Sequence, residues 1–262
     1  MFNLNKKIIK LIKNIMSFTF EKKNNGKKNK LIATIQKKKG IETDIYLNLQ
    51  KTDNKIDNII SNGDKIIPII DKTLRSVLYI AGPSGSGKSM FVSKWIHNAL
   101  QFYKKDEVFL FSPIKDDPSL DTIDYTKVEL NNEIKDLTID DFENTFVIFD
   151  DTDTIKDKYI SGLLNNLRDE LLETGRHSNT KMVITSHLIN NYKDTRRILN
   201  ESTAIVIYPN SSGTYGIRSY LKTYMGLNKE QIDRILKHKD RWVLISKTYP
   251  IYILTENELY FP

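Results

Sequence analysis

The chain has 262 residues, of which 39% are hydrophobic and 28% charged, a composition that is ordinary for one sizeable α/β domain with appendages. It contains no cysteine, which excludes disulfide bonds, thiolate zinc sites and cysteine nucleophiles, and no apolar run reaches the roughly 18–20 residues of a membrane span, so we expect a soluble or at most peripheral protein. The formal net charge of +7 is uneven, because residues 1–40 carry twelve Lys and one Glu while the rest of the chain is slightly acidic.

The N-terminal segment 3–20 has apolar residues at helical spacing with lysines between them, which predicts a basic amphipathic helix. Three roles are open for it: attachment to nucleic acid, attachment to an acidic membrane or partner surface, and packing on its own domain with the lysines in solvent. Residues 21–30 are rich in Lys and Asn and are typical of a linker. Short strands are expected at 31–35 and 45–49.

The apolar run 65–70 contains Pro68, which indicates an edge strand or a loop, because proline lacks the N–H that a central strand needs. The sequence therefore divides into a basic N-terminal extension and linker with short strands, residues 1–63, and a main α/β domain, residues 64–262.

A glycine-rich loop follows a predicted strand at 77–81 and precedes a predicted helix at 89–102. It matches the phosphate-binding pattern G-x-x-x-x-G-K-[ST] over eight residues: Gly82, Pro83, Ser84, Gly85, Ser86, Gly87, Lys88 and Ser89. The glycines allow successive backbone N–H groups to surround an anion, and the helix N-terminus faces the same phosphates. We expect Lys88 to reach the β- and γ-phosphates of ATP and the Ser89 hydroxyl to bind Mg²⁺.

An acidic pair ends the predicted strand 145–149, which is continuously apolar, as strands buried on both faces of a parallel sheet are. Such a strand delivers its carboxylates at the edge of the sheet where the phosphate loop lies. We assign Asp150 to Mg²⁺ together with Ser89. Asp151 stands where many ATP-hydrolysing proteins have a Glu that polarises the attacking water, and Asp153 is the alternative for that role.

A second polar strand end is predicted after the acidic pair. Helical spacing at 160–171 is followed by Gly175 at the position of a C-terminal cap, and the apolar strand 181–184 then ends on Thr185 and Ser186. A hydroxyl at the tip of a strand beside the acidic one can bind the γ-phosphate or the attacking water, so Thr185 and Ser186 are candidates for a sensing role.

Three arginines, Arg176, Arg196 and Arg197, are candidates for a finger inserted into a neighbouring subunit's site, where a guanidinium offsets the charge that develops on the transferred phosphoryl group. Another buried strand is expected at 204–208, a helix at 220–237, and a C-terminal hairpin near 241–255. No metal-ligand spacing connects the four histidines, so none is predicted to bind zinc: His97, His177, His187 and His238.

Together these motifs resemble the genome-packaging ATPases of large double-stranded DNA viruses and virophages, the poxvirus-type group within the FtsK–HerA superfamily of ring-forming DNA pumps. The resemblance covers about residues 66–261. It rests on the phosphate loop, on the run 147–151, and on residues 175–177 before a strand with a polar tip. The segment 111–121 and the hairpin after Trp242 fit the same pattern.

The resemblance implies a RecA-like, doubly wound and mostly parallel α/β sheet of the ASCE type, with one strand between the phosphate-loop strand and the acidic strand, and a C-terminal β-hairpin. It implies Mg²⁺-dependent ATP hydrolysis that drives duplex DNA into a preformed capsid, with active sites at the subunit interfaces of a hexameric ring. The implied partners are double-stranded DNA of any sequence, further copies of the chain and a capsid or portal-like vertex protein, in the virion or the host cytoplasm. Many members carry Gln where this chain has Ser186-His187.

Two other functions stay open at this point. A small-molecule or nucleotide kinase shares the phosphate loop, although no Arg-rich lid stands between the motifs. A nucleotide-gated binding protein at a membrane or nucleic-acid surface would use the basic N-terminal helix as its anchor.

Overall fold

The computed structural model describes residues 16–24, 26–37, 40, 42–49, 55–70, 75–104, 106–190 and 195–262. Most of the predicted basic helix, residues 3–15, lies outside this part of the chain. At its predicted end, Ser17–Thr19 forms a short strand, β1, so the helix does not continue to residue 20.

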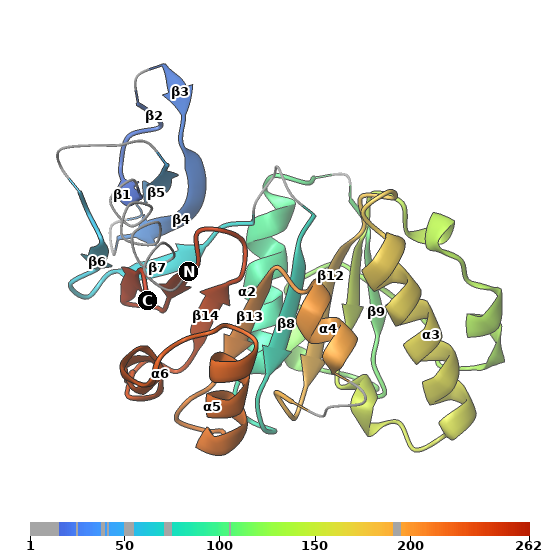
Figure 1. Ribbon diagram of the computed structural model, residues 1–262. Coiled ribbons are helices and arrows are strands. Elements are labelled where there is room, and N and C mark those ends of the chain that lie inside the picture. The colour runs from blue at the N-terminus through green and yellow to red at the C-terminus, as the bar shows by residue number, and fades with distance from the viewer. Residues whose placement is uncertain are drawn as a thin grey trace, which may run out of the picture.

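A ten-stranded sheet forms the centre of the molecule (Figure 1). In sheet order its strands are β10 (Thr126–Lys127), β9 (Val108–Phe111), β11 (Phe146–Phe149), β12 (Lys181–Ser186), β8 (Val77–Ala81), β13 (Ala204–Ile207), β14 (Val243–Ser246), β15 (Tyr252–Leu254), β16 (Glu258–Tyr260) and β6 (Asn58–Ile60). The strands from β10 to β13 are parallel and the others antiparallel. The mostly parallel sheet is confirmed, and so is the strand, β12, between the phosphate-loop strand and the acidic strand.

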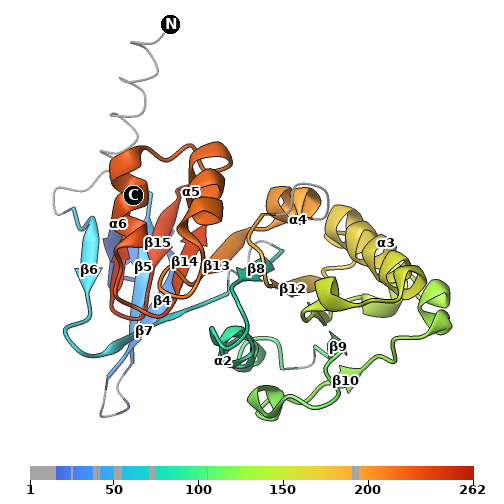
Figure 2. The ribbon, with the colours of Figure 1, turned by 90° about the horizontal axis from the view of Figure 1, so that it is seen from below.

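Helices cover both faces of the parallel strands because the strands are apolar on both faces. Leu78 and Ile80 of β8 belong to the same core as α2 (Lys88–Leu100), whereas Val77 and Tyr79 face the opposite core. That second core contains α3 (Lys158–Thr174), α4 (Arg196–Glu201), α5 (Thr214–Thr223) and α6 (Lys229–Leu236). Figure 2 shows α2 on one side of the sheet and α3 and α4 on the other. Four short 3-10 helices lie in the connections: η1 (Pro118–Leu120), η2 (Asn132–Asp136), η3 (Ile139–Phe142) and η4 (Thr152–Thr154).

A second sheet, of four antiparallel strands, packs on the α2 side of the large one, beside its antiparallel strands (Figure 1). Its order is β1, β5 (Glu42–Asn48), β4 (Lys30–Gln36) and β7 (Lys65–Pro68). Pro68 lies on the edge strand, as expected. The predicted linker contains a small hairpin of β2 (Lys23–Asn24) and β3 (Lys27–Lys28).

On either side of the predicted boundary between residues 63 and 64, the flanking strand pairs with the sheet of the other unit. β6, which precedes the boundary, pairs with β16 of the large sheet, and β7, which follows it, pairs with β4 of the small sheet. The Phe18 ring also stacks on Phe261 with a centroid distance of 4.2 Å. The division of the chain at residue 63 stays a prediction, and the two units share one apolar core.

The single helix predicted at 220–237 is wrong. α5 ends at Thr223 and α6 begins at Lys229, because Gly226 turns the chain with a φ of 64° and Asn228 starts a new helix with a capping box to Gln231. The C-terminal hairpin is confirmed as β14 and β15. Among the described residues, no helix is both long and apolar enough to cross a membrane.

Candidate active site

The phosphate loop connects β8 to α2 at the carboxyl edge of the parallel strands. Gly85 and Gly87 have φ angles of 75° and 106°, in the left-handed region that residues with a side chain rarely adopt. A Cβ atom on Gly82 would lie 2.7 Å from both the Ser86 hydroxyl oxygen and the Tyr208 ring. The loop therefore depends on glycine both for its turns and for its close packing against β13.

Lys88 connects the loop to the acidic strand. Its side chain is only 6% exposed, and its Nζ donates a hydrogen bond to the carbonyl oxygen of Gly82 at 3.0 Å. The same nitrogen lies 3.3 Å from Oδ1 of Asp151. The two sequence motifs, which are far apart in the chain, thus meet through the ion pair between Lys88 and Asp151.

Asp150 is buried at the end of β11 between two neighbouring strand ends. Its carboxylate accepts hydrogen bonds from Ser112 Oγ at 3.1 Å and from Thr185 Oγ1 at 2.8 Å. Burial raises the pKa of Asp150, the hydrogen bond from Thr185 opposes this shift, and the charge of Asp151 adds to it. A cation bound beside this carboxylate would favour its ionised form.

Thr185 holds the two adjacent carboxylates together. Besides its contact with Asp150, its hydroxyl lies 3.0 Å from Oδ1 of Asp151 and accepts the backbone N–H of Asp151 at 2.8 Å. The hydroxyl has one proton, so it donates to only one carboxylate at a time. Asp151 has a φ of 45°, an uncommon conformation for a residue with a side chain.

Ser186 and His187 form a second polar group with Asp153. The Ser186 hydroxyl donates to Asp153 Oδ2 at 2.8 Å, and the backbone N–H of His187 donates to the same oxygen at 3.2 Å. The His187 ring lies between the carboxylates, with Nε2 3.6 Å from Asp151 Oδ2 and Nδ1 3.7 Å from Asp153 Oδ1. The hydroxyls of Thr185 and Ser186 thus contact carboxylates, and their sensing role stays a prediction.

The three candidate finger arginines lie away from the phosphate loop of their own chain. Arg176 is exposed in the turn before β12, which is the opposite edge of the sheet from the loop. Arg197 forms ion pairs with Asp169 and, at 2.8 Å, with Glu173 on α3. Arg196 is exposed at the first residue of α4. All three arginines are exposed, and the role of any of them as a finger in a neighbouring copy stays a prediction.

Ser112, His187 and Arg241 belong to the site although sequence reasoning did not assign them to it. Ser112 and His187 could have been found, because each is a polar residue directly after a buried strand. Arg241 had no such signal. It lies 155 residues beyond Ser86, yet its Nε donates to the Ser86 carbonyl oxygen at 2.7 Å and its Nη2 to the Gly85 carbonyl oxygen at 3.2 Å.

The position of Arg241 follows from the sheet. β14 is antiparallel to β13, and its first residue, Val243, pairs with Ile207 at the end of β13. Arg241 and Trp242 therefore precede β14 at the same edge as the phosphate loop. A Cβ atom on Gly87 would lie 2.9 Å from the Arg241 guanidinium carbon, so the side chain lies directly against the loop.

Comparison with known proteins gives one relative of high similarity and several solved structures of low sequence identity. The chain is 39% identical over 215 residues to protein V3 of Sputnik virophage, covering 81% of this chain and 87% of V3. No protein-family model matches the chain.

Among solved structures, the conjugation coupling protein TcpA of pCW3, bound to ATPγS, has a TM-score of 0.53 at 12% identity, over 89% of this chain and 78% of TcpA. The cytoplasmic domain of the Type VII secretion ATPase EccC of Thermomonospora curvata has a TM-score of 0.50 at 11% identity, over 76% of this chain and 28% of the solved chain. B204, the DNA-packaging ATPase of Sulfolobus turreted icosahedral virus, has a TM-score of 0.48 at 13% identity, over 69% of this chain and 97% of B204. At these identities the likeness to TcpA and EccC shows the fold alone, and that fold is the one of P-loop ATPases.

Proposed function

The chain belongs to the same family as protein V3 of Sputnik virophage, and on that premise we propose that it is an ATP-driven motor that translocates double-stranded viral DNA into a preformed capsid. It hydrolyses Mg²⁺-bound ATP at the subunit interfaces of a ring of identical copies, with six as the expected number. The ring works at a capsid or portal-like vertex, in the virion or the host cytoplasm.

The observation that supports hydrolysis is the meeting of Lys88, Asp150 and Asp151 at one edge of the sheet, beside the polar end of β12. This arrangement has a cation for the phosphates, a buried carboxylate for a metal and a second carboxylate for water.

The residues present fit ATP and Mg²⁺. The Ser86 hydroxyl is buried and has no hydrogen-bond partner among the described residues, so the loop offers a donor that a phosphate oxygen would satisfy. Asp150 and Ser89 would hold Mg²⁺, since buried carboxylate and hydroxyl oxygens are its usual protein ligands. When bound, Mg²⁺ neutralises charge on the phosphates.

The residues of the chain act on the substrate in a definite order. Lys88 exchanges its contact with the Gly82 carbonyl oxygen for the phosphates of ATP and frees one oxygen of Asp151. Asp151 then orients a water molecule for attack on the γ-phosphorus, while Thr185 and His187 hold its carboxylate. The bond from the γ-phosphorus to the bridging oxygen of ADP breaks as the bond to water forms, and the released proton goes to solvent. An arginine of a neighbouring copy, Arg176, Arg196 or Arg197, stabilises the developing charge.

The charge distribution supports contact with DNA. The hairpin of β2 and β3 projects from the small sheet (Figure 1) and carries four exposed lysines: Lys22, Lys23, Lys27 and Lys28. Lysines on a projecting hairpin bind phosphates without reading bases, as a motor that moves any sequence requires. We assign this hairpin to the DNA path.

Steady-state ATP hydrolysis with and without long duplex DNA, over a range of protein concentrations, tests the proposal. We expect turnover that rises with DNA, that rises more than linearly with protein concentration, and that is lost in Lys88→Ala. Turnover that is linear in protein and indifferent to DNA would contradict the motor. ATP binding without turnover would instead indicate a nucleotide-gated binding protein.

A further inference from the structure

A cluster of three metal-ligating side chains lies beside the groups that handle the γ-phosphate. It consists of Asp151 and Asp153, which follow β11, and His187, which follows the neighbouring strand β12. One carboxylate oxygen of each aspartate and one ring nitrogen of His187 lie within 4.8 Å of one another. Among the described residues, no other group of His, Asp or Glu side chains comes together in this way.

The contacts around the cluster leave one oxygen of each carboxylate free. Oδ1 of Asp151 lies 3.3 Å from Lys88, and Oδ2 of Asp153 accepts hydrogen bonds from the Ser186 hydroxyl and from the backbone N–H of His187. No hydrogen bond from the described part of the chain reaches Asp151 Oδ2 or Asp153 Oδ1. These two oxygens lie next to the His187 ring.

The imidazole between these oxygens is also unpaired. His187 Nδ1 is buried and has no hydrogen-bond partner in the described residues. The ring nitrogens lie 3.6 Å from Asp151 Oδ2 and 3.7 Å from Asp153 Oδ1, which is longer than a hydrogen bond. Buried polar atoms are almost always paired, so a lone nitrogen between two free carboxylate oxygens indicates a ligand that all three can bind.

The spacing suits a metal ion. In tetrahedral sites, Zn²⁺ lies about 2.0–2.2 Å from histidine nitrogen and carboxylate oxygen, which puts two ligand atoms about 3.3 Å apart. The 3.6 Å between His187 Nε2 and Asp151 Oδ2 is close to that value, and a separation of 4.8 Å must close by about 1.5 Å. The side chains of His187 and Asp153 are 33% and 37% exposed, so they have room to move and the cluster is open to ions from solvent.

Hydrogen bonds and charge both favour a cation in this cluster. The Ser186 hydroxyl donates to Asp153 at 2.8 Å, and hydrogen bonds of this kind orient the carboxylate ligands of metal sites. Three carboxylates follow β11 here, those of Asp150, Asp151 and Asp153. In the described part of the chain, Lys88 is the one ammonium group that pairs with them. The negative charge that remains attracts a dication.

We propose that Asp151, Asp153 and His187 bind a transition-metal dication with the ligand preferences of Zn²⁺. This site differs from the one expected for Mg²⁺ at Ser89 and Asp150, because imidazole suits Zn²⁺ whereas Mg²⁺ prefers oxygen alone. The prediction that no histidine binds zinc considered the spacing between histidines, whereas these ligands come from two neighbouring strand ends.

The bound dication turns hydrolysis off. This consequence rests on the proposed ATPase function, in which Asp151 orients the attacking water. A carboxylate held by a metal ion together with His187 cannot turn towards the water, so turnover stops, while Lys88 and the phosphate loop still bind ATP. The level of free metal would thus regulate the motor without competing with its nucleotide.

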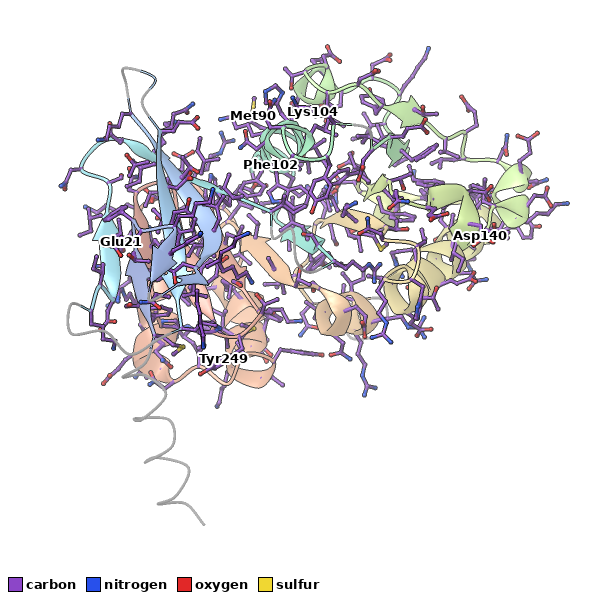
Figure 3. The ribbon with its side chains drawn as sticks, turned by 90° about the horizontal axis from the view of Figure 1, so that it is seen from above. Glu21, Met90, Phe102, Lys104, Asp140 and Tyr249 are labelled. Atoms are coloured by element: carbon purple, nitrogen blue, oxygen red, sulfur yellow. The ribbon has the colours of Figure 1, made fainter. Side chains whose placement is uncertain are left out.

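Isothermal titration of the untagged full chain with Zn²⁺ tests the site, without nucleotide and with Mg²⁺ in excess to fill sites that have oxygen ligands alone. His187→Gln and Asp153→Asn each remove one ligand, and Asn keeps an oxygen for the hydrogen bond from Ser186. His177→Gln and Asp140→Asn are the matched controls, because both residues are exposed and precede the strands whose other ends carry the cluster. Asp140 lies in η3, at the end of the molecule away from the small sheet (Figure 3).

We expect one Zn²⁺ per chain. Loss of a hydrogen-bond partner of a ligand weakens metal binding by about 10–100-fold, so Ser186→Ala should weaken it about tenfold or more and each ligand variant at least about 100-fold, with both controls within about twofold of the wild type. In the chain labelled with ¹⁵N-histidine, the ring nitrogens of His187 should shift on addition of Zn²⁺. A wild type that does not bind Zn²⁺, or equal affinities in His187→Gln and His177→Gln, would overturn the site.

ATP hydrolysis at buffered free Zn²⁺ separates this failure from failure of the proposed function. Zn²⁺ that fills the site should stop turnover by the wild type and leave its affinity for ATP unchanged, whereas His187→Gln should keep most of its own turnover. Wild-type turnover that persists with the site filled would contradict the regulation. Zn²⁺ binding at His187 in a chain that hydrolyses no ATP even without Zn²⁺ would support the site and refute the ATPase.

Discussion

Replacing Thr185 by Val tests the account of the acidic pair, because valine has nearly the shape of threonine and removes only the hydroxyl. The variant removes the hydroxyl that lies 2.8 Å from Oδ1 of Asp150 and 3.0 Å from Oδ1 of Asp151, and with it the one hydrogen bond that this hydroxyl donates to a carboxylate. A hydrogen bond to a charged group contributes about 1.5–3 kcal/mol. The variant should therefore lose about that free energy of unfolding when Asp150 is ionised, which lowers the melting temperature by about 3–12 °C for a chain of this size.

The loss should depend on pH in a direction that the structure fixes. Burial already raises the pKa of Asp150 above its unfolded value, so its ionisation costs stability as the pH rises through the folded pKa. Thr185→Val raises that pKa further, because it removes a hydrogen bond to the ionised form. The destabilisation should therefore be complete where Asp150 is fully ionised and shrink as the pH falls through its raised folded pKa.

Thermal unfolding followed by circular dichroism at several pH values between 5 and 8 measures this effect. Thr180→Val is the control, because the Thr180 hydroxyl is also buried but donates to the neutral carbonyl oxygen of Phe142 at 2.8 Å. The control should lose about 1 kcal/mol at every pH. If the loss in Thr185→Val did not shrink as the pH falls through the folded pKa of Asp150, its hydroxyl would matter for packing and not for the carboxylates.

Three further predictions concern other parts of the molecule. Arg241→Gln should raise the KM for ATP about tenfold or more, because two charged hydrogen bonds to the phosphate loop are lost. The kinetic control is Arg234→Gln, which removes an ion pair with Glu258 on the surface. Equal KM values in the two variants would refute the role of Arg241. Replacing the four hairpin lysines by Gln should weaken the salt dependence of duplex DNA binding. The slope of the logarithm of the association constant against the logarithm of the salt concentration should fall by up to about 3.6, which is about 0.9 for each phosphate contact. An unchanged slope would show that the hairpin does not lie on the DNA path. Burial lowers the pKa of Lys247 to about 8, so the folded chain releases this proton earlier than the unfolded chain, and stability should rise between pH 8 and 9.5. Lys247→Met should lack this rise in chemical denaturation, and a variant that keeps the wild-type slope would contradict the assignment.

Sequence was sufficient for features that are set locally. The phosphate loop, its strand and its helix occupy 24 consecutive residues, from the start of β8 to the end of α2. The spacing of the glycines directly indicates the geometry of the turn between them. The acidic strand end is equally local. Its distance from the loop could be inferred because parallel strands end at a common edge, and the 3.3 Å contact between Lys88 and Asp151 agrees with that argument.

Sequence was insufficient where the outcome depends on which strands pair. Arg241 lies against the phosphate loop because β14 is antiparallel to β13. The local sequence near residue 241 does not predict which strand β14 pairs with. The segment 220–237 contains two helices where one is predicted, because Gly226 turns the chain with a φ of 64° and Asn228 caps a new helix.

Because β6 pairs with the large sheet and β7 with the small one, the chain cannot be cut between them without opening both sheets. A protein that begins at residue 64 loses β6 and β4 together, so β16 becomes an open edge and β7 loses its partner strand. Unpaired edges invite pairing with other chains, and the shortened protein is expected to aggregate although it keeps every motif of the ATPase. The N-terminal strands β4 and β6 thus pair with strands of the main domain. We therefore expect insertions or fusions to be better tolerated before β1 than between β6 and β7.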